Sequence, residues 1–308
     1  MRVADFDFDL PPDRIAQTPA AERQAARLLV LDRATGGLGH HTVGALPALL
    51  APGDLLVVND TRVVPARLLG RRVPSGGAVE CLLLSPRGDG CWDALMHPGQ
   101  RLRPGARVVF ERGGRRLCGE VLARRFHGRR TIRLWTEDGA PVDEAIDRVG
   151  HVPLPPYIRR GDTPVDAERY QTVYATERGS VAAPTAGLHL TTDLLDQLRQ
   201  RGVGVARVTL HVGYGTFAPI RADEVEAHRV DPEPYHVPRE TAGAVRRARR
   251  DGRRVVAVGT TTTRTLETAA RAGGGELRAG DGVSDLYLYP GASFHVVGGL
   301  LTNFHLPR

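Results

Sequence analysis

The chain has 308 residues and a formal net charge of +7, and all 42 of its basic residues are arginines. The absence of lysine excludes a Schiff-base lysine, a Walker-type phosphate lysine and a lysine general base. Arginine binds phosphates bidentately and stacks on bases, which fits a polyanionic partner. A GC-rich genome that encodes arginine in place of lysine explains the same excess equally well.

The cysteines and the apolar segments point to a protein of the cytoplasm. No segment is long and apolar enough for a membrane helix, and the first residues lack the apolar core of a signal peptide. Cys81, Cys91 and Cys118 have no metal-ligand spacing and are odd in number, which is typical of reduced cysteines. We therefore expect a cytoplasmic protein with no membrane partner.

The first strong element is an apolar strand at residues 54–58, followed by a polar segment at 59–62. Such a short, continuous apolar run is typical of a strand buried on both faces of a sheet. Similar strands are predicted at 203–212, 254–258 and 285–289, with helices at 193–201 and 264–271. Thr191 and Thr192 offer N-cap oxygens to the first helix, and Gly202 closes it. This alternation predicts an α/β domain with a largely parallel sheet.

Residues 63–150 have a different sequence pattern from the segments on either side. Short strand-like runs at 80–84, 107–110, 119–122 and 131–135 are separated by turns rich in Gly, Pro and Arg. We predict a small β-barrel domain at 63–150, inserted into an α/β domain made of residues 1–62 and 151–308. Arginine pairs at 115–116, 124–125 and 129–130 lie at the predicted barrel turns, where they form either a solvated surface or a track for a phosphate backbone.

The segment 179–189 consists almost entirely of small residues. It has no large side chain before Leu188 and no titratable group before His189. Glycines at both ends tolerate unusual backbone angles and close approach of another surface. The segment is interpreted either as the floor of a ligand site or as an inert crossover loop.

Two other loops follow predicted strands. Residues 259–263 combine backbone amides at a helix N-terminus with threonine hydroxyls, which indicates either a seat for a phosphate or carboxylate or an ordinary N-capping loop. His211 ends a predicted strand just before Gly213 and Gly215. Ligands bind beyond the carboxyl ends of parallel strands, so these loops are expected to converge at one edge.

Three histidines lie at element boundaries, His189, His211 and His305. Histidine exchanges protons near neutral pH, although a single histidine is more often structural than catalytic. Neither a zinc-ligand pattern, a nucleophile elbow nor a dinucleotide fingerprint is present in the sequence. The sequence therefore favours proton-transfer chemistry without a metal.

Several long motifs closely resemble the S-adenosylmethionine:tRNA ribosyltransferase-isomerases of the queuosine pathway. They lie at residues 59–68, 153–158, 168–175, 179–189, 211–217, 259–267 and 302–307, in one order along the chain. The chain departs from the family pattern in the segment 228–233, where Asp231 takes the place of a histidine, and at Leu190, which takes the place of a phenylalanine. Family chains usually continue beyond the motif that ends here at Arg308, so a fragment or a shortened relative is expected.

The resemblance implies a reaction in which the ribosyl group of S-adenosylmethionine is transferred to 7-aminomethyl-7-deazaguanine at the wobble position of tRNA. The ribose is rearranged to an epoxycyclopentanediol, giving epoxyqueuosine and releasing adenine and methionine. The expected partners are tRNA and S-adenosylmethionine, the latter consumed as a substrate and not kept as a cofactor. No metal is expected, and we expect a monomer.

The candidate site residues come from the motifs just described. His189 or His211 is predicted to be the base that removes the acidic C5′ proton beside the sulfonium, and the sequence does not choose between them. Asp60 is a further catalytic candidate, and Arg62 is predicted to hold ribose hydroxyls or the acceptor amine. The segment 259–263 suits the methionine carboxylate. The other predicted substrate-binding residues are Ser180, Thr185, Gly213, Gly215, Thr216, Gly259, Thr260, Thr261, Thr262, Arg264, Asn303 and His305.

Two alternative functions remain open from the sequence. One is the same chemistry with a free 7-deazapurine as the acceptor in place of tRNA. The other is a non-catalytic RNA-binding relative, which the altered segment 228–233 and the position of the last residue motivate.

Overall fold

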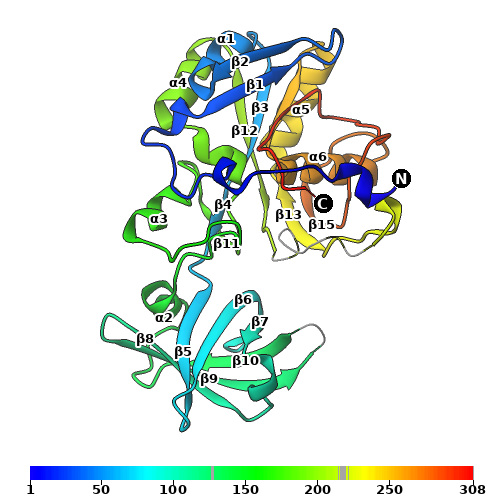
Figure 1. Cartoon of the computed structure of the whole chain (residues 1–308). Coiled ribbons are helices and arrows are strands. Elements are labelled where there is room, and N and C mark those ends of the chain that lie inside the picture. The colour runs from blue at the N-terminus through cyan, green and yellow to red at the C-terminus, as the bar shows by residue number, and fades with distance from the viewer. Residues whose placement is uncertain (126–127, 214, 216–219, 221, 308) are drawn as a thin grey trace.

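The computed structural model describes residues 1–125, 128–213, 215, 220 and 222–307. Figure 1 shows a small barrel below a larger, helix-covered sheet, with the chain crossing between them near β4 and β5. This arrangement confirms the predicted fold class, an α/β sheet domain with an inserted β-barrel. None of the helices in the described ranges is long and apolar enough to cross a bilayer.

The large sheet has six strands in the order β15-β13-β12-β3-β14-β16. Parallel pairing joins β12, β3, β14 and β16, whereas β13 and β15 are antiparallel additions at one side. The strands are β3 (Leu55–Asn59), β12 (Gly204–Leu210), β13 (Glu233–Val237), β14 (Val255–Val258), β15 (Gly280–Ser284) and β16 (Gly299–Leu301). The strands predicted at 54–58, 203–212 and 254–258 are therefore confirmed.

Alternate residues of β3 pack on the two sides of this sheet. Leu56 and Val58 belong to a core with α4 (Thr192–Gln200) and α1 (Leu46–Leu49). Leu55 and Val57 belong to a second core with α5 (Arg239–Arg250) and α6 (Thr260–Ala272). Helices thus cover both faces, which explains why β3 has a continuous apolar sequence and is buried along its whole length.

Two predictions about element positions are wrong. Residues 285–289 are not a strand; β15 ends at Ser284, before them. Helix α6 begins at Thr260, four residues before the predicted start at Arg264. The helix predicted at 193–201 is confirmed as α4, where the Thr191 hydroxyl accepts a hydrogen bond from the Leu194 amide at 3.1 Å.

Six antiparallel strands form the closed barrel, in the order β10-β7-β6-β5-β8-β9. They are β5 (Arg67–Val73), β6 (Ala78–Gly88), β7 (Cys91–His97), β8 (Arg107–Arg112), β9 (Arg115–Arg124) and β10 (Arg129–Trp135). Phe110, Leu117 and Ile132 are fully buried inside, and Ile146 of α2 (Val142–Val149) packs on the same core. The barrel core draws on residues between 64 and 149 together with Val181, and the limits 63–150 for the inserted domain stay a prediction.

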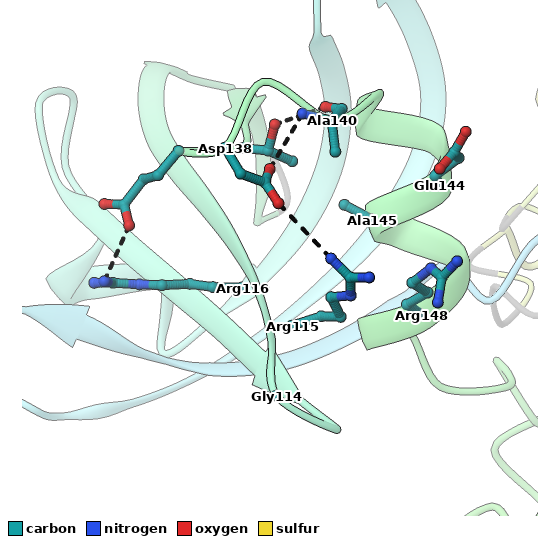
Figure 2. A pocket seen from close by; sticks show the side chains of 10 residues that line it. Gly114, Arg115, Arg116, Asp138, Ala140, Glu144, Ala145 and Arg148 are labelled. Atoms are coloured by element: carbon teal, nitrogen blue, oxygen red, sulfur yellow. Dashed lines mark hydrogen bonds and ion pairs between the residues drawn. The ribbon is translucent and has the colours of Figure 1, made fainter.

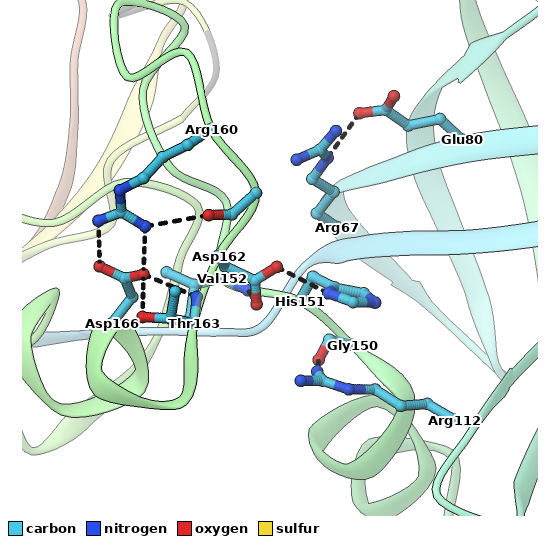
Figure 3. A network of polar contacts seen from close by, with 11 residues as sticks. Arg67, Glu80, Arg112, Gly150, His151, Val152, Arg160, Asp162, Thr163 and Asp166 are labelled. Carbon is cyan, nitrogen blue, oxygen red and sulfur yellow. Dashed lines mark hydrogen bonds and ion pairs between the residues drawn. The ribbon is translucent and has the colours of Figure 1, made fainter. Parts of the chain in front are cut away.

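Polar contacts fix the chain where it leaves the barrel (Figure 3). The Arg112 guanidinium donates to the Gly150 carbonyl at 2.5 Å, and His151 Nδ1 lies 2.7 Å from Asp162 Oδ1. Asp166 in α3 (Pro164–Arg169) forms a bidentate ion pair with Arg160. This ion pair holds the pKa of the Asp166 carboxyl well below its usual range. The return path into the sheet domain is therefore firmly held.

The remaining elements are short. A hairpin of β1 (Arg27–Leu31) and β2 (Leu38–Thr42) precedes α1, and β4 (Thr61–Val63) pairs in parallel with β11 (Glu177–Ser180). Within the described residues, the 3₁₀ helices are Val3–Phe6, Pro12–Arg14, Arg23–Ala25, Val43–Ala45, Gly99–Arg101, Thr185–His189 and Val225–Ala227.

Candidate active site

Asn59 lies at the end of β3 and connects three neighbouring segments. Its amide nitrogen donates to the Leu210 carbonyl at 3.0 Å and to the Thr261 hydroxyl at 3.3 Å. Its amide oxygen accepts from the backbone nitrogens of Leu210 and Thr61. Asn59 is fully buried, so these bonds rigidly join the ends of β12 and β3 to the start of α6. The predicted convergence of these loops at one sheet edge is confirmed.

His211 follows β12 at this edge. Its Nδ1 lies 2.8 Å from the Thr61 hydroxyl, which also donates to the Glu177 carbonyl at 3.4 Å. The hydroxyl has a single proton, so Thr61 accepts from Nδ1–H and the Nε2 lone pair of His211 is left available. Burial lowers the pKa of His211, which keeps the imidazole neutral at neutral pH. A neutral, oriented imidazole with a free Nε2 is suited to accept a proton.

Asp60 lies beside His211 in a more buried position. Its Oδ1 accepts a hydrogen bond from the Thr209 hydroxyl at 2.7 Å, and burial raises its pKa. Burial disfavours the charged form of this carboxyl, which keeps Asp60 a candidate for proton transfer. Arg62, two residues on in β4, has an exposed side chain.

The segment 179–189 forms one wall of the site. Gly179 lies so close to His211 that a Cβ at this position would be 2.8 Å from the imidazole Cε1. Ser180 is fully buried, and its hydroxyl donates to the Ala182 carbonyl and accepts from the Val212 amide. These contacts give Ser180 a role in joining the two loops, while a contact with substrate stays a prediction.

The 3₁₀ helix Thr185–His189 lies against the start of α6. Ala186 Cβ would be 3.8 Å from a Cβ added at Gly259, and Thr185 and His189 are half-buried. His189 Nδ1 lies 3.3 Å from the Ala186 carbonyl, and burial lowers the pKa of this imidazole too. His189 therefore stays a second candidate for the base.

The hydrogen-bond donors that the start of α6 offers to a ligand are mainly backbone amides and not threonine hydroxyls. Gly259 has a φ of +89°, and the helix begins at Thr260, so the first amides of α6 have no partner within the helix. The Thr262 hydroxyl donates to the Val258 carbonyl at 2.7 Å, and that of Thr261 accepts from Asn59. Any anion held here is thus expected to bind the amides of residues 260–262, with the exposed Thr260 hydroxyl beside them.

Arg264 is directed into the protein. Its guanidinium forms a 2.5 Å ion pair with the buried Glu233 and donates to the carbonyls of Ser284 and Leu286. Glu233 also accepts from the Gly213 amide at 2.7 Å. These bonds connect α6, β13 and the loop after His211, which makes Arg264 a positioning residue for that loop.

The other predicted binding residues lie around this edge. A Cβ added at Gly215 would be 3.0 Å from Asp231, and Asp231 pairs with Arg129 of the barrel at 2.5 Å. Thr216 lies outside the described residues. Asn303 is half-buried and His305 is exposed, both just after β16, whose Leu301 carbonyl accepts from the Gly259 amide.

Sequence reasoning did not select Asn59, Thr61 or Glu233 as site residues. The signal for Asn59 was a polar side chain directly after a wholly apolar strand, where an unpaired amide is costly to bury. Thr61 and Glu233 act through contacts between segments far apart in the chain, which no local pattern displays.

One predicted nucleic-acid contact is wrong. Arg130 is 1% exposed, and its guanidinium donates to the carbonyls of Leu102, Arg129 and Gly99 inside the barrel wall. Arg124 and Arg125 are exposed at the neighbouring barrel turn. The surface available to a phosphate backbone is therefore smaller than the arginine pairs indicated.

A cavity of about 200 Å³ lies on the outer side of the barrel beside α2. Figure 2 shows charged side chains of both signs around it, including the Arg116–Glu137 pair at 3.2 Å and the Arg115–Asp138 pair at 3.8 Å. Arg115 and Arg116 are already paired with carboxylates, and none of the lining residues belongs to the sheet edge that holds His211, so this cavity is not the candidate active site.

The fold and the site fit an enzyme that moves a proton at the carboxyl edge of an α/β sheet, next to an inserted β-barrel. Comparison with known families then gives the family. The sequence model of the family described as "Queuosine biosynthesis protein" matches residues 3–308, and the chain belongs to this family.

Named relatives are similar over the whole chain. An S-adenosylmethionine:tRNA ribosyltransferase-isomerase of Heliobacterium modesticaldum is 49% identical over 308 residues, covering 100% of this chain and 88% of the relative. One from Symbiobacterium thermophilum is 48% identical with the same coverage. A crystal structure of S-adenosylmethionine tRNA ribosyltransferase from Thermotoga maritima is 35% identical, covers 99% of this chain and 86% of that chain, and has a TM-score of 0.49.

Proposed function

We propose that the protein transfers and isomerises the ribosyl group of S-adenosylmethionine onto 7-aminomethyl-7-deazaguanine at the wobble position of tRNA. The products are epoxyqueuosine in tRNA, adenine and methionine. The observation that carries the proposal is the 49% identity, over the full chain, to a relative named for this activity. S-adenosylmethionine is a consumed substrate in this proposal, no resident cofactor takes part, and the protein works as a monomer in the cytoplasm.

The site supplies a base for the first step. The sulfonium acidifies the C5′ proton of S-adenosylmethionine, so a neutral imidazole is a sufficient base. His211 fits this role best, because Thr61 orients its ring and the lowered pKa keeps Nε2 unprotonated. The proton passes from C5′ to Nε2 of His211.

The site also supplies a proton donor and an anion seat. Adenine leaves more easily when it is protonated, and Asp60, whose pKa is raised by burial, is the carboxyl next to His211 that could deliver this proton. The amides at the start of α6 suit the methionine carboxylate, since a helix N-terminus favours a negative charge. With these assignments, the nucleoside binds beyond the carboxyl ends of β3 and β12, and the methionine binds at the start of α6, which follows β14.

The experiment is incubation of the protein with S-adenosylmethionine and tRNA that carries the aminomethyl base, with adenine release as the measurement. We expect release that requires this tRNA and is absent with unmodified tRNA. Release with the free base alone identifies a small-molecule acceptor. Tight tRNA binding without any adenine release contradicts the proposed catalysis.

A further inference from the structure

A second cavity, of about 180 Å³, lies between the barrel and the sheet domain. It is lined by the buried residues Val64, Ala66 and Val181 and by Leu84, Pro86 and Trp92 of the barrel. Asp143 of α2 and Arg178 of β11 add charged groups to the rim. The lining thus combines apolar and aromatic surface with a few polar groups, as in sites for planar ligands.

This cavity adjoins the candidate active site through two residues. Gly179 lines the cavity, and a Cβ added to it would lie 2.8 Å from the His211 imidazole. Ser180 also lines it, and its hydroxyl holds the amide of Val212, the residue after His211. The cavity therefore adjoins the proposed base at Gly179, a position that has no side chain.

The size of the cavity indicates which part of the substrates it takes. Pockets for ligands of drug size have volumes of about 300–1,000 Å³, so 180 Å³ is small for a whole sulfonium nucleoside. A single flat ring system is a better fit. Enzymes that act on a base in RNA commonly take that base out of the stack and bind it between aromatic and apolar side chains.

The charged residues at the rim distinguish between the two nucleobases of the reaction, the guanine-type acceptor and the adenine that leaves. Asp143 is exposed in the first turn of α2 and has no hydrogen bond or ion pair with any residue in the described ranges. A carboxylate accepts two hydrogen bonds side by side, which matches the N1–H and exocyclic amine of a guanine-type base. Adenine presents an acceptor at N1, which a carboxylate repels. Arg178, held by Asp147 at 2.6 Å, provides donors for a carbonyl oxygen such as O6.

We infer that this cavity is the subsite for the 7-deazaguanine base of the acceptor, with Trp92 as the stacking surface and Asp143 as the specificity-determining residue. The inference rests on the proposed function and deepens it.

A binding assay tests the inference without turnover. The chain has two tryptophans, so Trp135→Phe leaves Trp92 as the only indole reporter. We expect free 7-aminomethyl-7-deazaguanine to quench Trp92 fluorescence saturably and 7-deazaadenine to quench it at least about 10-fold more weakly. Asp143→Asn in this background is expected to raise the Kd for the guanine-type base by about 10- to 100-fold. Equal Kd values with and without Asp143→Asn overturn the inference.

Steady-state kinetics separate this inference from the proposed function. Asp143→Asn is expected to lower kcat/KM for the modified tRNA by about 10- to 100-fold and to leave the KM for S-adenosylmethionine unchanged. Glu144→Gln is the matched control, because Glu144 is the next residue of α2 and lines the outer cavity instead (Figure 2). If the wild type releases adenine with this tRNA but Asp143→Asn behaves like Glu144→Gln, the inference fails and the function stands. If the wild type releases none, the function fails, and the fluorescence assay still decides on the subsite.

Discussion

At the scale of single residues, the proposed function assigns the first proton transfer to His211. Replacing it by Ala removes the imidazole that Thr61 orients, so adenine release is expected to fall about 10²- to 10⁴-fold, the usual contribution of a general base. Thermal unfolding is expected to change little, because His211 is only half-buried. The matched control is His40→Ala, which removes an exposed histidine of β2 and should retain wild-type turnover. Wild-type turnover in His211→Ala would transfer the role to His189.

The pH dependence of adenine release is expected to follow the protonation of the His211 imidazole. Burial lowers the pKa of His211, and a base acts only when unprotonated. The rate is therefore expected to stay constant as the pH falls to the ordinary histidine pKa of about 6.5, and to decline only at lower pH. Single-turnover rates between pH 5 and 8 measure this limb, with circular dichroism at each pH as the control for folding. A rate that already declines at or above pH 6.5 would indicate that the base is a solvated histidine.

At the scale of elements, β11 positions the base through the absence of a side chain. Gly179→Ala places a Cβ 2.8 Å from the His211 Cε1, at a φ of +155°. We expect the imidazole to be displaced and adenine release to fall at least 10²-fold, as misplacement of about 1 Å does in other enzymes. The cost in folding free energy should be about 1–3 kcal/mol.

The control for this change is another glycine. Gly161→Ala puts a Cβ where no atom lies within 4 Å, so both activity and stability should match the wild type. Full activity in Gly179→Ala would show that the contact with His211 is not needed for turnover.

Elements with a strong local pattern were predictable from the sequence, and those built by distant contacts were not. The strand at 54–58 was found because helices cover both faces of β3 and require an apolar residue at every position. The start of α6 was missed because four threonines in succession have low helix propensity, while Thr262, Thr263 and Thr265 bond to carbonyls one turn earlier. The alternating sequence at 285–289 resembles a strand, but β15 uses the preceding Gly-rich residues instead.

The same limit applies to the site. His211 and the segment 179–189 were selected because unusual composition follows a strand end, and the sheet topology then brings them together. Arg130 was misassigned because a sequence of charges does not show which guanidinium turns inward to bind carbonyls. Glu233 was missed because its partners, Arg264 and Gly213, lie far from it along the chain.

At the scale of the whole molecule, the barrel and the sheet domain face each other across the proposed acceptor subsite. The exposed Arg124 and Arg125 lie on a barrel turn, whereas Arg246 and Arg250 lie on α5, which Figure 1 shows at the far side of the sheet domain. A tRNA whose wobble base enters the cavity beside Trp92 must place its anticodon phosphates near the barrel. The barrel arginines are therefore expected to bind phosphate and those of α5 are not.

This asymmetry is tested by the salt dependence of tRNA binding. Each lost phosphate contact reduces the slope of log K against log salt by about 0.7–0.9, so the double variant Arg124→Gln/Arg125→Gln should reduce it by about 1.5. The control double variant Arg246→Gln/Arg250→Gln removes the same charge from α5 and should leave the slope unchanged. The reverse result would mean that tRNA approaches over α5, and the wobble base would then have no path to the cavity between the domains.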